Sequence, residues 1–148
     1  MDAVRPGAEL IAAYRATEYV VAVSPPFVLQ VGRHSAELDR LMHLHGVDCA
    51  AYVTACNPGS VRVPQDQNRA AQERLESGLR AAGYTLIPGA GRDPAGHWPG
   101  EASVLVPGLS RAGAVDIGRA CRQHAVLWVR RGAAVELVLV ADREGDCT

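Results

Sequence analysis

The stretch from Asp48 to Ser60, DCAAYVTACNPGS, constrains the fold more than any other part of the chain. It holds a short apolar run that ends abruptly at the turn sequence Asn-Pro-Gly-Ser. A run of this length, bounded by turn residues, is typical of a central strand of a sheet. Because open α/β sheets usually bind ligands beyond the carboxyl ends of their strands, we expect a functional site at the end of this strand.

Strand and helix patterns follow one another along the rest of the chain. The segments 19–23 and 27–31 predict an antiparallel hairpin, whose prolines place it at a margin of the sheet. The segments 125–129 and 135–140 predict a second hairpin around a tight turn. The helix signals are a short amphipathic pattern over residues 8–15 and three capped helices, which begin at Ser35, Asp66 and Ser110.

This order of elements predicts one α+β domain over residues 1–148, with a mixed, mostly antiparallel sheet and about three helices packed on it. A chain of this length can bury one core and has little room for a second. Residues 1–7 and 142–148 are expected to be frayed termini. Residues 88–102 are rich in proline and glycine, and they predict a long irregular loop between strands at 84–87 and 103–106.

Polar residues occur where several predicted elements begin or end. Asn57 and Ser60 follow the central strand, and Asn68 projects from the buried side of the first turn of the next helix, where its amide needs partners. Glu101 precedes an apolar strand, so its carboxylate must be solvated, paired or raised in pKa. Arg92 is the nearby basic residue that could pair with it.

We therefore predict a small-molecule pocket at the end of the central strand, for a nucleoside-like or amino-acid-like ligand. If the pocket is catalytic, Glu101 is the proton carrier and His97 is the second catalytic candidate. The ligand-binding candidates are polar or aromatic residues from four separate segments: Asn57, Ser60, Asn68, Arg92, Trp98, Ser103 and Gln123. Turn formation, capping and core packing are the structural alternatives for the same residues.

An interaction module is the alternative function. In this hypothesis the glycine- and proline-rich loop and the third helix, which carries Arg111, Arg119 and Arg122, contact a protein or a phosphate backbone. The formal net charge of -1 argues against nucleic-acid binding driven by overall charge. A polar signature that only stabilises the fold is the third hypothesis.

The composition excludes several enzyme classes. All 15 basic residues are arginine, so this chain cannot form a lysine Schiff base, hold pyridoxal phosphate through lysine or build a Walker A loop. The cysteines and histidines lack metal-ligand spacing, and we expect neither a metal nor another cofactor. We also expect a cytoplasmic protein that does not enter membranes, because the first residues do not resemble a signal peptide and the apolar runs are short. The oligomeric state is left open.

Several of these motifs also occur in order in a known family. They are Thr-Glu-Tyr at 17–19, Thr-Ala-Cys-Asn-Pro-Gly-Ser at 54–60, Asn68, His-Trp-Pro-Gly-Glu-Ala-Ser at 97–103 and Gln-His-Ala-Val at 123–126. Over roughly 10–140, the chain resembles the bacterial domain-of-unknown-function family numbered 3293. The resemblance implies no activity, but it implies a shared polar signature: Asn57, Ser60, Asn68, Trp98, Glu101, Ser103 and Gln123.

Overall fold

The computed structural model describes residues 7–96 and 100–142. Within these residues the chain forms one seven-stranded sheet in the order β2-β1-β4-β5-β3-β6-β7, and all neighbouring strands are antiparallel. The strands are β1 (Glu18–Val21), β2 (Phe27–Leu29), β3 (Cys49–Val53), β4 (Ile87–Arg92), β5 (Glu101–Pro107), β6 (Ala125–Arg130) and β7 (Glu136–Leu139). The helices are α1 (Ala8–Ala16), α2 (Ala36–Leu44), α3 (Gln65–Ala81) and α4 (Arg111–Ala120), with short 3-10 helices η1 (Pro58–Ser60) and η2 (Val140–Asp142).

The predicted α+β arrangement is confirmed, with four α-helices in the described residues rather than about three. β3 lies between β5 and β6, inside the sheet, and both predicted hairpins are present, β1 with β2 at one edge and β6 with β7 at the other. Most of the termini that were expected to fray, 1–6 and 143–148, lie outside the described residues. No helix within the described part of the chain is both long and apolar enough to cross a membrane.

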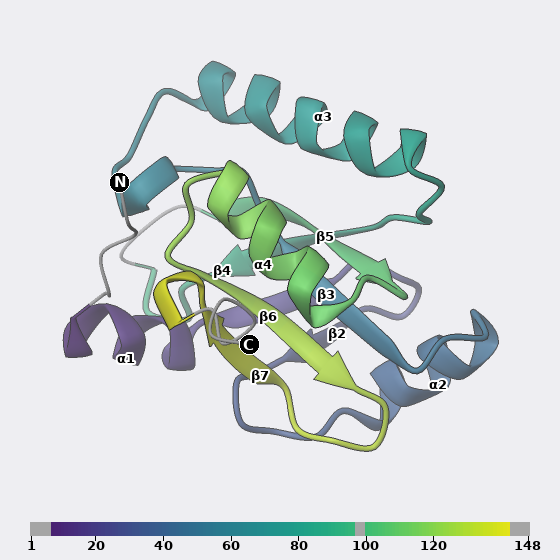
Figure 1. Cartoon of the computed structure of the whole chain (residues 1–148). Helices are drawn as coiled ribbons and strands as arrows, with labels where there is room; N and C mark the ends of the chain where they lie inside the picture. The colour runs from purple at the N-terminus through teal and green to yellow at the C-terminus, as the bar shows by residue number, and fades with distance from the viewer. Residues whose placement is uncertain (1–6, 97–99, 143–148) are drawn as a thin grey trace.

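Helices cover both faces of the sheet (Figure 1). α3 and α4 lie on one face, whereas α1 and α2 lie on the other, toward opposite ends. Because successive side chains of a strand point to opposite faces, β3 sends Ala50 and Tyr52 toward the α2 side and Ala51 and Val53 toward the α3 and α4 side. The central strand therefore contributes to two separate apolar cores.

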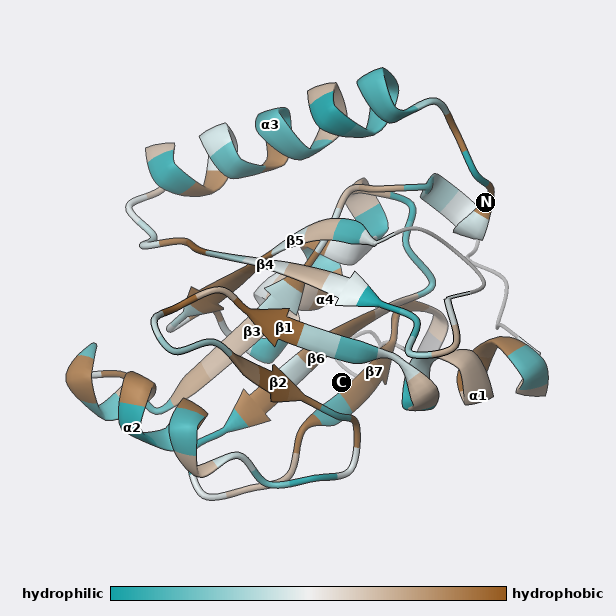
Figure 2. Cartoon of the chain, turned by 180° about the vertical axis from the view of Figure 1, so that it is seen from behind, coloured by the Kyte–Doolittle hydropathy of each residue, from teal (hydrophilic) through white to brown (hydrophobic). Residues whose placement is uncertain are grey.

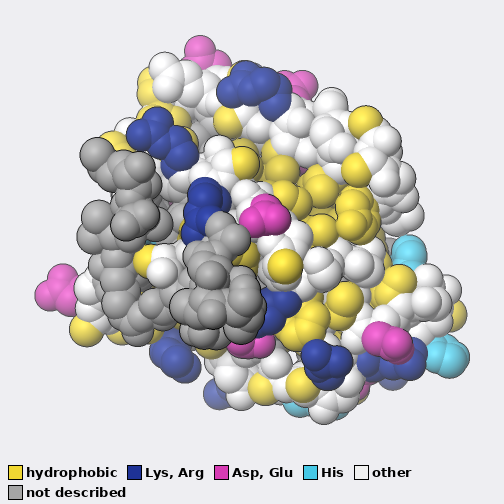
Figure 3. Space-filling view, in the orientation of Figure 1, with side chains coloured by type: hydrophobic (Ala, Val, Ile, Leu, Met, Phe, Trp, Pro, Cys, Tyr) yellow, Lys and Arg dark blue, Asp and Glu magenta, His cyan; other side chains and the backbone are white. Residues whose placement is uncertain are grey.

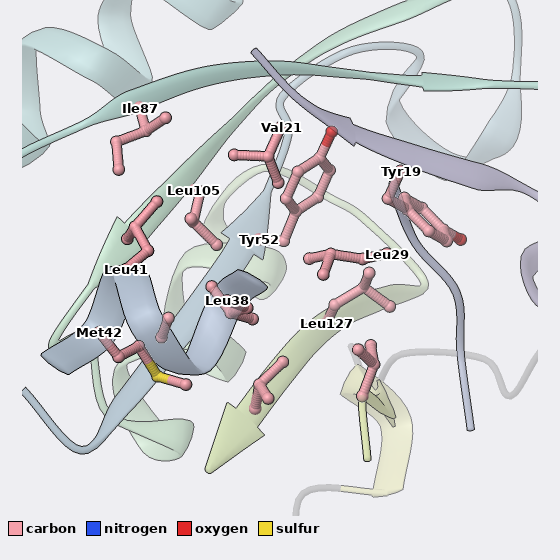
Figure 4. Close-up of a cluster of buried hydrophobic side chains, with 13 residues drawn as sticks. Tyr19, Val21, Leu29, Leu38, Leu41, Met42, Tyr52, Ile87, Leu105 and Leu127 are labelled. Carbon is pink, nitrogen blue, oxygen red and sulfur yellow. The ribbon is translucent and has the colours of Figure 1, made fainter. Parts of the chain in front are cut away.

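The core on the α2 side is built around one helix face and two tyrosine rings (Figure 4). Helical spacing places Leu38, Leu41 and Met42 on one face of α2, and all three are buried. The rings of Tyr19 and Tyr52 lie edge to face, with their centroids 5.6 Å apart. This core ends near the tyrosines, which also line the cavity described below.

The other core is covered less completely. α3 is hydrophilic along most of its length (Figure 2), and Leu79 is its only buried apolar residue. α4 contributes Ala114 and Val115. Hydrophobic side chains gather between α3 and α4 on this face (Figure 3), and Leu75 and Ile117 are among those packed partly buried against the core.

Two of the three predicted caps are confirmed. The hydroxyl of Ser35 accepts a hydrogen bond from the Leu38 amide at 3.1 Å, and the hydroxyl of Ser110 accepts one from the Gly113 amide at 3.0 Å. The cap predicted at Asp66 is wrong, because α3 begins at Gln65 and follows Pro64.

Helical spacing predicts that Ala71, Leu75, Gly78 and Leu79 form the inward face of α3, and this prediction is partly wrong. Gly78 is exposed, while Ala71 and Leu75 are only partly covered. The buried positions are Asn68 and Leu79, both of which were predicted on this side, and Gln72, which was not. Gln72 is therefore the one buried amide of α3 that the helical spacing did not predict.

The largest correction concerns residues 88–102. They were predicted to form an irregular loop, but residues 88–92 belong to β4 and residues 101–102 to β5, and these two strands pair with each other. The strand predicted at 84–87 is correspondingly displaced, since only Ile87 is in β4. The strand was not predicted because Pro88, Gly89 and Gly91 are residues that strands disfavour. β4 nevertheless pairs with β5 on one side and with β1 on the other.

Candidate functional site

A cavity of about 370 Å³, called here the main cavity, lies at the carboxyl end of β3, where α1 faces the sheet. Residues from α1, from the segment after β3 and from six of the seven strands line it. Its polar or ionisable lining residues are Tyr14, Thr17, Tyr19, Tyr52, Thr54, Cys56, Asn57, Ser60, Arg62, Glu101, Ser103 and Gln123. The chain thus places a cavity where the end of the central strand predicted a site.

Asn57 connects three segments at the wall of this cavity. Its side-chain Nδ2 donates to Oε2 of Glu101 at 2.6 Å, and its Oδ1 accepts from the Val63 amide at 3.1 Å. Asn68 completes the arrangement, because its Oδ1 accepts from the Asn57 amide at 2.8 Å and its Nδ2 donates to Asn57 Oδ1 at 2.9 Å. The buried amide of Asn68 is therefore satisfied, as expected of a buried polar group.

The backbone of Asn57 is also unusual. Its φ of 49° lies in the left-handed region, which asparagine tolerates better than most residues other than glycine. Ser60 has a φ of 63°, so the chain turns sharply as it leaves β3. Backbone conformations of this kind are held by surrounding contacts and concentrate at functional sites.

Glu101 opens β5 and presents a partly buried carboxylate to the main cavity. Burial raises the pKa of this carboxyl group, whereas the hydrogen bond from Asn57 and the positive charge of Arg62 act in the opposite direction. Burial is the largest of these effects. A carboxylate whose proton is held more tightly than usual is suited to proton transfer or to binding a cation.

Three tyrosines form the aromatic part of the lining. The hydroxyl of Tyr19 donates to the backbone oxygen of Tyr14 at 2.9 Å, and the hydroxyl of Tyr52 donates to the backbone oxygen of Val20 at 2.7 Å. The pKa of Tyr14 is raised, mainly by burial, while a hydrogen bond with Ser60 lowers it. Tyr14 therefore reaches from α1 to the segment after β3.

Some of the other predicted site residues line the main cavity, and others do not. Ser60, Ser103 and Gln123 line the main cavity with Asn57 and Glu101. The side-chain Nε2 of Gln123 donates to the Cys56 backbone oxygen at 2.9 Å, so it braces the end of β3. His97 and Trp98 lie outside the described residues.

The Arg92 side chain does not pair with Glu101, although its neighbour Gly91 lies opposite Glu101 in the β4 and β5 ladder. Its Nε atom bonds to Oε1 of Glu18 at 2.7 Å, across the β1 and β4 pair, and it does not line the main cavity. The predicted ion pair between Arg92 and Glu101 is therefore wrong. Alternation along β4 explains the difference, because Gly91, the neighbour of Arg92, faces the main cavity instead.

A second cavity of about 320 Å³ adjoins the first and shares Cys56, Asn57, Arg62 and Glu101 with it. Its remaining lining is predominantly polar: Val63, Gln65, Asn68, Arg69, Gln72, Glu73, Glu76, Gly100 and Ala102. The hydrogen-bonded Asn57 and Glu101 side chains belong to the walls of both cavities.

Comparison with protein families now identifies the chain. The model of the family described as "Protein of unknown function (DUF3293)" matches residues 53–126, half of the chain. The chain belongs to the DUF3293 family. The matched segment of this DUF3293 protein starts at the last residue of β3 and includes Asn57, Asn68, Glu101 and Gln123. No curated protein and no solved structure matches the chain.

Sequence reasoning missed part of the cavity lining in this DUF3293 protein. Tyr14 and Tyr52 fit the apolar periodicity of their elements, so the sequence predicts core residues there. Arg62 lies in a short extended segment without a motif. Arg62 immediately precedes the Asn57-bonded Val63, and that proximity to a strand end is the one signal that could have indicated it.

Metal binding and cysteine chemistry receive little support from the described residues. No group of three His, Cys, Asp or Glu side chains there is arranged to hold a metal ion. Burial raises the pKa of the Cys56 thiol, and the negative charge of Glu101 adds to this effect. Cys56 is therefore a weak nucleophile at neutral pH.

Replacing Glu101 with glutamine tests the burial of the carboxylate in the DUF3293 fold. Because the folded-state pKa of Glu101 is raised, folding favours its protonated form, and its ionisation costs stability as pH rises above the usual value of 4.5. We expect E101Q to unfold at a higher urea concentration than the wild type at pH 7, with a difference that shrinks toward pH 4. A difference that is the same at both pH values would contradict this account.

Proposed function

We propose that the main cavity binds a small polar molecule, such as a nucleoside or an amino-acid derivative. The observation that carries this proposal is one cavity lined by a partly buried carboxylate and an amide, those of Glu101 and Asn57, and by three tyrosine rings. Ligand pockets usually combine a mainly apolar lining with a few convergent polar groups. The volume of about 370 Å³ falls within the range typical of such pockets.

Glu101 is the residue that we propose for chemistry, if the bound molecule reacts. Its raised pKa brings proton exchange closer to neutral pH, and its bond to Asn57 fixes the orientation of the carboxylate. Ser60, Ser103 and Gln123 are proposed ligand contacts from other parts of the wall. The catalytic role of His97 and the ligand contact of Trp98 stay predictions.

The alternative of an interaction module has less support. Arg111 forms an ion pair with Glu136 at 2.7 Å, and Arg119 donates to the backbone oxygen of Val140 at 3.3 Å. Two of the three arginines that suggested this function are thus bonded within the chain. It stays a prediction, and no contact in the described residues favours it.

A tryptophan at position 13 would test the proposal directly. Ala13 is exposed on α1 and lines the main cavity, whereas its neighbour Ala12 is exposed and lines neither cavity. We expect A13W to weaken binding of a ligand found by thermal-shift screening of nucleosides and amino acids at least about tenfold, since the indole would occupy part of the space. Calorimetric titration measures the affinity.

A12W is the matched control, because it adds the same side chain to the same helix outside the cavity. Its affinity should stay within about twofold of the wild type. Equal weakening by both variants would contradict the cavity as the binding site. Failure of every nucleoside and amino acid to bind the wild type would contradict the proposal itself.

A further inference from the structure

The main cavity carries two opposite charges at the same part of its wall. Arg62 and Glu101 both line it, and the positive charge of Arg62 opposes the rise in the pKa of Glu101. We call Arg62 and Glu101 the charged wall. Both residues also line the second cavity, so the charged wall lies where the two cavities meet.

The remainder of the main cavity is largely apolar or aromatic. We call its large apolar and aromatic side chains the apolar wall: Leu10, Tyr19, Tyr52, Leu127 and Leu137. The hydroxyl groups of Tyr19 and Tyr52 already donate to backbone oxygens at 2.9 Å and 2.7 Å. These two residues therefore offer mainly ring surface to a ligand.

The separation of the charged wall from the apolar wall favours one of the two proposed ligand classes, nucleosides and amino-acid derivatives, over the other. A nucleobase carries several donors and acceptors around its ring, and each would lose free energy if it were buried against the apolar wall without a partner. A nucleoside is also uncharged, so it would match neither member of the charged wall. An α-amino acid carries an ammonium and a carboxylate on one carbon, and its side chain can be wholly apolar.

We propose that the main cavity takes a free α-amino acid with a bulky apolar or aromatic side chain. The ammonium group lies at Glu101, the carboxylate at Arg62 and the side chain along the apolar wall. This inference rests on the proposed function and narrows its ligand class. The forked guanidinium of arginine is suited to a carboxylate, and its five N–H donors allow it to serve more than one acceptor.

The second cavity supports this orientation of the ligand. Asn68, Gln72 and Glu76 belong to its lining and lie beyond the charged wall. Gln72 is held in place, because its Oε1 accepts from the Ala55 amide at 2.8 Å and its Nε2 donates to Glu76 at 3.1 Å. The charged end of the ligand thus has polar side chains around it on the side of the second cavity.

Calorimetric titration of the full chain with L-phenylalanine and matched analogues tests the inference. Phenethylamine lacks the carboxylate, 3-phenylpropionate lacks the ammonium, and adenosine represents the nucleosides. We expect L-phenylalanine to bind, each truncated analogue to bind at least about tenfold more weakly, and adenosine to bind weakest of all. This comparison uses the wild type, so it does not depend on whether any variant folds.

Two variants then assign each charge. E101Q should weaken L-phenylalanine and phenethylamine but leave 3-phenylpropionate nearly unchanged, whereas R62Q should weaken L-phenylalanine and 3-phenylpropionate but leave phenethylamine nearly unchanged. R40Q, which removes an exposed arginine from α2, is the control and should alter none of the affinities. A merely structural role for Glu101 or Arg62 would not produce this selective pattern.

The outcomes separate the inference from the proposed function. If adenosine binds and A13W weakens it while L-phenylalanine does not bind, the pocket stands and the amino-acid inference is wrong. Equal affinities for L-phenylalanine and both truncated analogues would also overturn the inference. If no amino acid and no nucleoside binds the wild type, both the inference and the proposed function fail.

Discussion

Replacement of Gly89 with alanine is expected to lower the free energy of unfolding by about 3 kcal/mol. Gly89 pairs with Val21 across the β1 and β4 ladder. A Cβ atom at this position would overlap the backbone oxygen of Val20 and lie 2.7 Å from the hydroxyl oxygen of Tyr52. Those two oxygens already share a hydrogen bond of 2.7 Å, so neither can move without breaking it.

Gly91 provides the matched control for this substitution. It lies two residues along the same strand, and the nearest atom to a Cβ there would be the Thr17 methyl carbon at 3.7 Å, an ordinary contact. We expect G91A to change the free energy of unfolding by less than about 0.5 kcal/mol. Urea denaturation followed by circular dichroism measures both variants, and equal midpoints for G89A and G91A would contradict the close approach of β1, β4 and Tyr52.

Gly89 also explains why β4 could not be predicted. Strand prediction depends on β-branched and aromatic side chains, and β4 has glycine at two of its six positions. The small residues are needed because Tyr52 crosses from β3 to reach the Val20 backbone oxygen. This requirement comes from a residue 37 positions away in the sequence, so no local pattern around Gly89 reveals it.

Elements with local signals were predicted well. β3 has an apolar run and turn residues in one short window, and Ser35 and Ser110 can each cap a helix three residues before a free backbone amide. Such features need only neighbours in the sequence. The two hairpins predicted the antiparallel pairing of β1 with β2 and of β6 with β7.

The buried face of α3 shows the opposite case. Gln72 is buried because its side chain accepts from the Ala55 amide at 2.8 Å, where β3 has ended and strand pairing no longer satisfies that amide. Helical periodicity favours apolar residues for such a position. Here the backbone amide of Ala55 requires a hydrogen-bond acceptor, and Gln72 supplies it. Helical periodicity carries no information about that requirement.

The candidate site was predicted in part for the same reason. Five of the predicted site residues line the main cavity, and they stand at or near the ends of elements, where polar residues are noticeable: Asn57, Ser60, Glu101, Ser103 and Gln123. Asn68 bonds to Asn57 from the second cavity. Tyr14 was missed because the sequence does not show where α1 lies on the sheet. Arg92 was placed wrongly because its position depends on the pairing of β4 with β1, which was not predicted.

Replacement of Asn57 with aspartate is expected to make folding strongly dependent on pH. The change is nearly isosteric, but it replaces the donor at 2.6 Å from Glu101 with a second carboxylate oxygen. Two carboxylates at this separation cannot both ionise without repulsion, so the pKa of the pair is raised in the folded state. Arg62 reduces this repulsion, whereas Tyr14, Tyr19 and Cys56, whose pKa values the charge of Glu101 raises, remain neutral.

The sign of the effect follows from the raised pKa of the pair. Folding then favours the protonated forms, so the variant keeps most of its stability below the ordinary carboxyl value of 4.5 and loses it as pH rises. At pH 7, N57D should be less stable than the wild type by about 3 kcal/mol, from the lost hydrogen bond to a charged group and the added repulsion. Urea denaturation at pH 4, 5.5 and 7 measures the loss.

Glycine at position 57 separates charge from the loss of the side chain. N57G removes the same donor, adds no carboxylate and tolerates the positive φ of 49° at this position. Its loss of stability relative to the wild type should therefore vary much less between pH 4 and pH 7 than that of N57D. Parallel pH profiles for N57D and N57G would mean that position 57 does not face the Glu101 carboxylate. The contact that orients Glu101 would then be absent, both for the proposed acid chemistry and for the proposed binding of an ammonium group.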